Sequence, residues 1–282
     1  MTYREKYSQI KNIKSKYITG LVISSLLIDD GGFANFTELV KHFDDNLKNE
    51  AEIDGKLARI LAGEPMQYVL GHAFFVHGEY KVTPDVLIPR QETEQLMMSA
   101  LKRIGEIFGF EKNITIADIG TGSGVLAVSL KRNLKNAKMI AADISPKCIE
   151  VAKENAKTYG VDIDFRVGDM LEPIKEKLDV IISNPPYIEN ESTVDEQTLK
   201  YEPHLALFAF PKTKYYKEIL SHIKQMNEEF LIAFEIGEDM KEELTELLET
   251  KYIGVGYSFE EDIYYKTRFL FVFKFKGMEK YE

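Results

Sequence analysis

The fold of this 282-residue chain is decided by one stretch of sequence, DIGTGSG at residues 118–124. An apolar run at residues 114–119 leads into it, and apolar residues at helical spacing begin at Val125. We therefore predict a strand that ends in a glycine-rich turn and is followed directly by a helix. Glycines allow the backbone to turn sharply and to approach a ligand without a side-chain clash, and the helix N-terminus presents free N–H groups to that ligand.

Outward from this stretch, apolar runs alternate with helical patterns. The sequence predicts seven strands, at residues 114–119, 138–143, 162–167, 178–183, 230–236, 252–259 and 268–275. It predicts helices between most of them, at residues 125–134, 146–159, 214–226 and 238–249. This alternation indicates an α/β fold with a mainly parallel sheet covered on both faces. The last two strands, which no helix separates, indicate an antiparallel edge.

The N-terminal part of the chain has a different pattern. Residues 1–60 show no strand-like alternation, and their apolar residues recur at helical spacing. A short hairpin is predicted next, with strands at residues 73–76 and 80–82 and a His-Gly-Glu turn at residues 77–79. We place the domain boundary near residue 85, between a small helical domain with a C-terminal hairpin at residues 1–85 and a second domain at residues 86–282.

Composition and charge indicate a globular protein and argue against a broad nucleic-acid-binding surface. With 44% apolar and 29% charged residues, the chain is typical of a soluble globular protein. The formal charge is −10, and residues 228–262 hold twelve acidic and two basic residues, so the rest of the chain is nearly neutral. A broad basic surface for a phosphate backbone is therefore not evident. We expect no direct nucleic-acid partner, although a small basic patch stays open.

The cysteine and histidine content and the hydropathy pattern indicate the cellular compartment of the protein and whether it binds a metal. A single cysteine, Cys148, forms neither an internal disulfide nor a structural zinc cluster, which favours a reducing cytoplasmic environment. The apolar run at residues 18–28 is about half as long as a membrane span, so we interpret it as a buried helix and expect no membrane partner. The five histidines show no metal-ligand spacing, and no metal is expected.

Acidic residues end two of the predicted strands. Asp143 closes the strand that follows the glycine turn, and Asp169 comes after the next strand. A carboxylate at the first position accepts hydrogen bonds from ribose hydroxyls, and one at the second meets an adenine amino group. Taken alone, each Asp is more often a helix cap or a loop residue. Together with a G-x-G-x-G turn, which lacks the G-x-G-x-x-G spacing of dinucleotide-binding folds, they indicate an adenosyl ligand.

The sequence NPPY at residues 184–187 directly follows the predicted strand at residues 178–183. Two prolines remove two N–H donors and fix the backbone, so the loop presents acceptors suited to a planar NH₂ group. We expect the Asn184 side-chain oxygen to accept one N–H and the Pro185 carbonyl the other, with Tyr187 packed on the flat face of the acceptor. A proline-rich turn without function is the alternative. The combination resembles class I S-adenosylmethionine-dependent methyltransferases that modify amide or exocyclic amino nitrogens.

Further stretches narrow this resemblance. The sequences GEPMQYVLG at 63–71, FF at 74–75, VLIPRQETE at 86–94 and YEPHLAL at 201–207 resemble the release factor glutamine methyltransferase family. The sequence departs from the family pattern in three places. Gln91 stands where the family usually has a second proline, Met170 where some relatives have an aromatic residue, and Asn227-Glu228 where a Gly-Gly turn is usual.

The resemblance implies a seven-stranded Rossmann-like methyltransferase sheet with a small helical N-terminal domain. It implies methyl transfer from S-adenosylmethionine, with S-adenosylhomocysteine as product, to the side-chain amide nitrogen of glutamine in the Gly-Gly-Gln motif of peptide chain release factors. The implied cofactor residues are Gly120, Thr121, Gly122, Ser123, Gly124, Asp143, Asp169, Met170 and Asn184. The implied substrate residues are Asn184, Pro185, Pro186 and Tyr187, with Arg90 and Glu92 at the entrance; Asn184, Pro185 and Tyr187 are the implied catalytic residues.

Other functions stay open at this point. An adenine amino group in DNA or RNA also suits the NPPY loop, and a glutamine in a ribosomal protein is a closer alternative to the release factor. A dinucleotide-dependent oxidoreductase, or a nucleoside-binding module without catalysis, would represent a different class. The glycine spacing and the NPPY loop argue against both members of that class.

Overall fold

The computed structural model describes residues 1–76 and 78–276; His77 of the expected turn and residues 277–282 of the expected second domain lie outside the described residues. The contacts of the chain divide it into two units. The first comprises Met1–His72 and Glu196–Tyr201, and the second comprises Ala73–Asp195 and Glu202–Glu282. The domain boundary that we place near residue 85 stays a prediction.

The first unit is helical. Its helices are α1 (Tyr3–Lys11), α2 (Gly20–Gly31), α3 (Phe36–Lys41), α4 (Glu50–Leu61), α5 (Met66–Leu70) and α9 (Glu196–Tyr201). Thr2 begins α1 with a capping box, in which its side chain and that of Glu5 satisfy each other's backbone N–H groups. The apolar stripes of α1, α2 and α4 form a separate core around Ile10 and Leu27. The spacing of apolar residues that predicts these helices therefore reflects their burial.

A short hairpin follows α5 in the chain. Its strands are β1 (His72–Phe75) and β2 (Gly78–Lys81), which pair in a two-stranded sheet. The pairing lies one or two residues from the predicted strands. Asn155 holds β2 in place, since its side-chain Oδ1 accepts from the Lys81 N–H at 2.7 Å and its Nδ2 donates to the Lys81 carbonyl at 3.0 Å.

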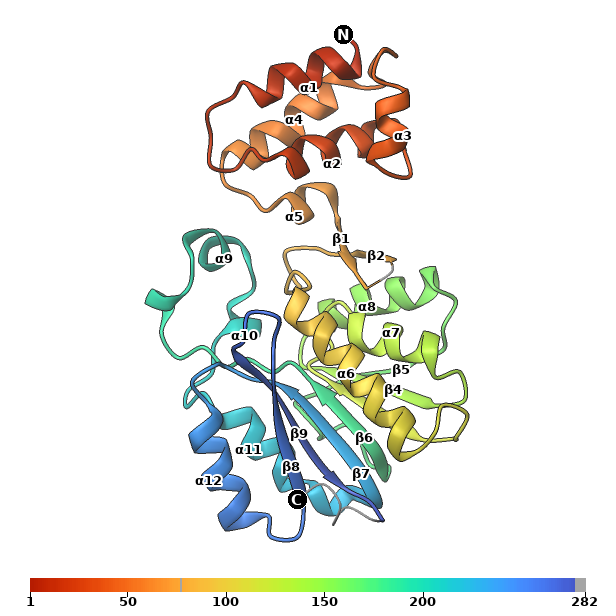
Figure 1. Ribbon diagram of the computed structural model, residues 1–282, viewed down its shortest axis with the longest axis vertical. Coiled ribbons are helices and arrows are strands. Elements are labelled where there is room, and N and C mark those ends of the chain that lie inside the picture. The colour runs from red at the N-terminus through yellow and green to blue at the C-terminus, as the bar shows by residue number, and fades with distance from the viewer. Residues whose placement is uncertain (77, 277–282) are drawn as a thin grey trace. The chain divides into compact units, whose positions relative to one another are not determined.

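The second unit is built on a seven-stranded sheet in the order β5-β4-β3-β6-β7-β9-β8 (Figure 1). Its strands are β3 (Thr115–Ile119), β4 (Lys138–Asp143), β5 (Asp164–Val167), β6 (Leu178–Ser183), β7 (Met226–Glu235), β8 (Gly256–Glu261) and β9 (Thr267–Lys274). β3 to β7 run parallel, and β9 pairs antiparallel with both β7 and β8. The predicted α/β class, the seven strands and the antiparallel edge are confirmed.

Helices cover both faces of this sheet. They are α6 (Gln91–Ile107), α7 (Val125–Asn133), α8 (Pro146–Thr158), α11 (Lys214–Ser221) and α12 (Lys241–Lys251), and the short helix α10 (His204–Leu207) precedes α11 in the chain. Residues of α6, α7 and α8 pack into one apolar cluster with the sheet, and residues of α11 and α12 into another (Figure 1). The two clusters explain why the parallel strands are nearly continuous apolar runs.

Several elements differ from the sequence-based expectations: the short helices α5, α9 and α10 were not predicted, and two larger differences concern α6 and α11. α6 was not predicted, although its buried residues Thr93, Leu96, Met97, Ala100 and Ile104 recur at helical spacing. The helix expected at 214–226 ends at Ser221, and a 3₁₀ turn at Ile223–Gln225 leads into β7. Here tertiary contacts override helical periodicity, because the Gln225 side chain donates to two carbonyls, those of Ile174 and Glu176, and Met226 already pairs with β6.

Candidate functional site

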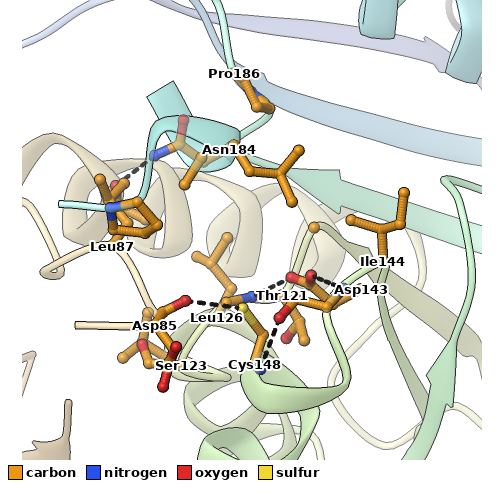
Figure 2. A pocket seen from close by; sticks show the side chains of 18 of the residues that line it. Asp85, Leu87, Thr121, Ser123, Leu126, Asp143, Ile144, Cys148, Asn184 and Pro186 are labelled. Atoms are coloured by element: carbon orange, nitrogen blue, oxygen red, sulfur yellow. Dashed lines mark hydrogen bonds between the residues drawn. The ribbon is translucent and has the colours of Figure 1, made fainter. Parts of the chain in front are cut away.

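A cavity of about 510 Å³ opens at the carboxyl ends of β3, β4 and β6. In parallel α/β sheets this edge is where ligands bind. The residues singled out by the sequence that line it are Arg90, Gly120, Thr121, Gly122, Ser123, Asp143, Asp169, Met170, Asn184 and Pro186. Figure 2 shows Asn184 and Pro186 on one side of the cavity and Thr121, Ser123 and Asp143 on the other. The cavity thus joins the glycine turn to the NPPY loop.

The glycine turn combines two different uses of glycine. Gly120 and Gly122 have φ values of +69° and +54°, and a Cβ on either would meet no atom within 4 Å. These two positions therefore need glycine for backbone conformation and leave the adjacent space open. Gly124 differs, because a Cβ there would lie 2.9 Å from the Cβ of Ala152 on α8. Gly124 therefore permits close packing of α7 on α8, which explains why it does not line the cavity.

Asp118 lies beneath the turn and is fully buried. Its Oδ2 accepts from the Thr121 hydroxyl at 2.6 Å and from the Ala127 N–H at 3.1 Å. Its Oδ1 has no hydrogen-bond partner among the residues that the structure describes. Burial raises the pKa of Asp118 to about 7. This carboxylate holds the turn and the start of α7 together rather than facing the cavity.

Asp143 ends β4 and faces the cavity, as Figure 2 shows. Its Oδ2 accepts from the Gly122 N–H and its Oδ1 from the Ser145 N–H, each at 2.9 Å. Burial raises the pKa of Asp143 above its usual value. A carboxylate oxygen is able to accept more than one hydrogen bond. Asp143 therefore fixes the glycine turn and keeps acceptor capacity for a ligand hydroxyl.

The side chain of Asn184 is held at the opposite side of the cavity. Its Nδ2 donates to the Thr93 hydroxyl of α6 at 3.0 Å, and that hydroxyl donates to Oε2 of Glu235 at 2.7 Å. Figure 2 shows the nitrogen and the oxygen of the Asn184 amide directed to different sides, with the nitrogen in a hydrogen bond. Among residues 1–76 and 78–276, no group donates a hydrogen bond to the Asn184 Oδ1. Asn184 lines the cavity, and its amide oxygen keeps its acceptor capacity.

Four residues implied by the resemblance do not line the cavity: Gly124, Pro185, Tyr187 and Glu92. Pro185 is buried, and the contact of its carbonyl with an acceptor group stays a prediction. The Tyr187 hydroxyl donates to Oε1 of Glu235 at 3.4 Å, and its ring packs against the apolar cluster of α11 and α12. Burial raises the pKa of Tyr187. The stacking of Tyr187 on an acceptor group therefore stays a prediction.

Sequence reasoning missed Thr93 and Glu235. Both are buried, and both belong to the hydrogen-bonded group that ends at Asn184. Two signals were present: Glu235 ends a strand next to β6, and Thr93 lies within the stretch at residues 86–94. Burial raises the pKa of Glu235 to about 7.

Two further groups shape the cavity wall. The Arg90 guanidinium forms an ion pair with the buried carboxylate of Glu202, which also accepts from the Ile88 N–H at 3.1 Å. The Cys148 thiol donates to the Asp85 carbonyl at 3.3 Å, and burial raises its pKa to about 11. A thiol with this pKa stays protonated near neutral pH, which makes it a packing group rather than a nucleophile.

The described residues contain no group of three or more His, Cys, Asp or Glu side chains that is arranged to hold a metal ion. Within the same part of the chain, every helix is too short or too polar to cross a membrane.

Comparisons with known proteins identify the family and the fold. The family described as "Methyltransferase small domain" matches residues 92–201. The release factor glutamine methyltransferase of Bacillus anthracis is 38% identical over 216 residues, which are 74% of this chain and 76% of that protein. The release factor glutamine methyltransferase of Enterococcus faecalis is 34% identical over 271 residues, which are 92% of this chain and 96% of that protein. A methyltransferase structure from Pyrococcus furiosus superposes with a TM-score of 0.52 at 17% identity, covering 79% of this chain and 99% of that one.

The structural match, at low identity, establishes the methyltransferase fold. The sequence relatives go further, since they exceed 30% identity and are matched over most of their length. This chain therefore belongs to the release factor glutamine methyltransferase family.

Proposed function

We propose that this enzyme transfers a methyl group from S-adenosylmethionine to the side-chain amide nitrogen, N5, of the glutamine in the Gly-Gly-Gln motif of peptide chain release factors. One observation carries the proposal: the glycine turn after β3 and the side chain of Asn184 after β6 line the same cavity in a member of this family. A cofactor site and an acceptor site are thereby adjacent, as direct transfer between two bound groups requires.

The glycine-turn side of the cavity fits an adenosyl cofactor. The volume of about 510 Å³ lies within the range of small-molecule sites. The Asp143 carboxylate would accept hydrogen bonds from ribose hydroxyls, and Asp169 would meet the adenine amino group. Gly120 and Gly122 leave room for a ligand because no side chain projects from either. When bound, S-adenosylmethionine supplies an electrophilic methyl group on a positively charged sulfur.

The Asn184 side would hold the acceptor amide. An amide nitrogen is a poor nucleophile because its lone pair is delocalised into the carbonyl, so its placement governs the rate. The Asn184 Oδ1 and the Pro185 carbonyl would accept the two N–H groups of the glutamine. These acceptors orient the nitrogen and favour the positive charge that develops on it. Correct orientation of two reacting groups contributes about 7–11 kcal/mol to lowering a barrier.

Mass spectrometry of three methylated candidates tests the substrate. The purified enzyme is incubated with labelled S-adenosylmethionine and, separately, a release factor, ribosomal proteins and DNA. We expect label on a single glutamine of the release factor. A release factor in which that glutamine is replaced by Asn is the matched control and should stay unlabelled. Label found only on ribosomal protein or on DNA would contradict the proposed substrate and would leave the methyltransferase assignment intact.

The Asn184→Ala variant tests the acceptor site. We expect kcat to fall by about 10²–10³-fold, the usual effect of removing one oriented polar group from a transition state. S-adenosylhomocysteine should still bind with at least part of its affinity, because the glycine turn across the cavity from Asn184 is unchanged. Calorimetry and initial rates measure the two quantities. A wild-type kcat in this variant would remove Asn184 from the proposed mechanism.

A further inference from the structure

A chain of buried hydrogen bonds leads from Glu235 at the end of β7 to Asn184 at the cavity. The Thr93 hydroxyl of α6 lies between them, donating to Glu235 at 2.7 Å and accepting from Asn184 at 3.0 Å. The Glu235 side chain is 2% exposed and that of Thr93 is 5% exposed. We call these three residues the amide relay. Glu235 and Thr93 are separated by 142 positions, so the tertiary fold brings the relay together.

The direction of each hydrogen bond in the relay follows from donor counting. A hydroxyl has one hydrogen, and an ionised carboxylate only accepts. The Thr93 hydrogen is therefore committed to Glu235, which leaves only lone pairs facing Asn184. The amide must then present its NH₂ group to Thr93, because an amide oxygen there would face another acceptor. The ionised Glu235 thus selects the one amide orientation that turns the Asn184 Oδ1 away from α6.

We infer that Glu235 and Thr93 are positioning residues that fix the side-chain amide of Asn184 with its oxygen available to the acceptor glutamine. This inference rests on the role of Asn184 under the proposed function. Glu235 does not line the cavity, so its carboxylate acts through Thr93 and not by contact with the substrate. Such buried groups keep a site within the narrow geometry that transfer requires.

Charges around Glu235 make the relay sensitive to pH. Burial and the nearby Glu92 carboxylate raise its pKa, while the Thr93 hydroxyl, the Arg268 guanidinium of β9 and the Tyr187 hydroxyl lower it; the outcome is a pKa of about 7. On its backbone side, the Glu235 carbonyl accepts from the Tyr216 hydroxyl at 2.7 Å. A Glu235 that is protonated on Oε2 donates to Thr93, whose own hydrogen then turns toward Asn184. The amide flips in response, and its oxygen no longer faces the acceptor.

The first experiment uses two variants of Thr93. Thr93→Val keeps the shape and removes the hydroxyl, and we expect kcat to fall by about 10²-fold, as for a small misplacement of a reacting group. Thr93→Ser keeps the hydroxyl and should recover most of that loss. The KM for S-adenosylmethionine should change less than twofold, about the limit of measurement. Thr250→Val, at an exposed position of α12, is the matched control and should leave kcat unchanged.

The second experiment uses the pH profile of kcat. In the wild type, kcat should fall as pH falls through about 7, the pKa of Glu235. Glu235→Gln has no ionisable group at this position, so this acid limb should disappear between about pH 6 and 8, whatever the rate of the variant. Binding of S-adenosylhomocysteine, measured by calorimetry in each variant, confirms a folded site.

Four outcomes overturn the inference. They are an unchanged kcat in Thr93→Val, equal losses in Thr93→Val and Thr93→Ser, an acid limb that persists in Glu235→Gln, and additive losses in the Thr93→Val, Asn184→Ala double variant. The inference requires that the double variant lose no more than Asn184→Ala alone, because both changes remove one function. An impaired Asn184→Ala with an unimpaired Thr93→Val would overturn the relay and leave the proposed function standing.

Discussion

The two sides of the cavity are built in opposite ways. On the glycine-turn side, residues 118–124 and Asp143 hold one another mostly through backbone groups: Asp143 accepts from two N–H groups, and Asp118 from one N–H and one hydroxyl. On the Asn184 side, Asn184, Thr93 and Glu235 come from distant segments and meet only through side chains. Each side stands on one buried carboxylate whose pKa is raised to about 7.

This difference separates binding from chemistry. A backbone-based site has few degrees of freedom, so changes on the glycine-turn side should alter stability and cofactor affinity. In a site built from side chains, a substitution can change a rotamer or an amide orientation without changing the backbone. Changes on the Asn184 side should therefore alter kcat while leaving the fold in place. A glycine-turn substitution that lowered only kcat, or an Asn184-side substitution that lowered only stability, would contradict this division.

The largest expected effect is on the glycine-turn side. Gly124→Ala places a Cβ 2.9 Å from Ala152 at a φ of +81°. Left-handed strain of about 1–2 kcal/mol and overpacking of about 1–3 kcal/mol should together lower the free energy of unfolding by about 2–5 kcal/mol. Urea denaturation measures this change.

Gly122→Ala is the matched control for this prediction. Its φ of +54° is also left-handed, but its Cβ would meet no atom within 4 Å. We therefore expect only the strain of about 1–2 kcal/mol. Equal losses of stability in the two variants would show that Gly124 is needed for its conformation alone and not for the packing of α7 on α8.

The same division explains how far the sequence could predict the molecule. Residues 118–124, Asp143 and residues 184–187 each lie at the end of a strand with a clear apolar pattern, so the sheet and much of the cavity follow from local sequence. The apolar residues of α6 recur at helical spacing, yet the sequence-based interpretation did not include this helix. The link between Thr93 and Glu235 depends on the register of β7 and the packing of α6, which no local pattern encodes.

Side-chain direction was equally beyond the sequence. The pattern NPPY predicts that the Tyr187 ring packs on the flat face of the acceptor group. In the structure the Tyr187 hydroxyl meets Glu235 and the ring joins the apolar cluster on the α11 side of the sheet. A buried carboxylate that needs hydrogen-bond donors accounts for this orientation.

The next effect in size is on cofactor affinity. Asp143→Ala removes the carboxylate that holds the Gly122 and Ser145 N–H groups. The loss of charged hydrogen bonds should weaken binding of S-adenosylhomocysteine by about 10–100-fold in calorimetry, with a smaller change of kcat at saturating cofactor. Asp164→Ala, at an exposed position of β5, is the control. A variant that lost kcat while keeping cofactor affinity would place Asp143 on the chemical side of the comparison.

The smallest effect, taken for one group and one pH unit, is on the pH dependence of stability, to which the two buried carboxylates contribute. Both have a pKa of about 7 in the folded protein, against usual values of about 4 in an unfolded chain. Between these values the folded state binds more protons than the unfolded state. The free energy of unfolding should therefore fall as pH rises from about 4 to 7, by at most about 1.4 kcal/mol per pH unit for each group. Urea denaturation across this range measures the slope.

Asp118→Asn and Glu235→Gln should each remove one share of that slope. In the described part of the chain the two carboxylates share no hydrogen-bond partner, so the shares should add in the double variant. Only Glu235→Gln should also remove the acid limb of kcat, because only Glu235 reaches the acceptor side. A double variant whose slope changes by less than the sum would mean that the two carboxylates titrate as one coupled pair, and the two sides of the cavity would then not be independent.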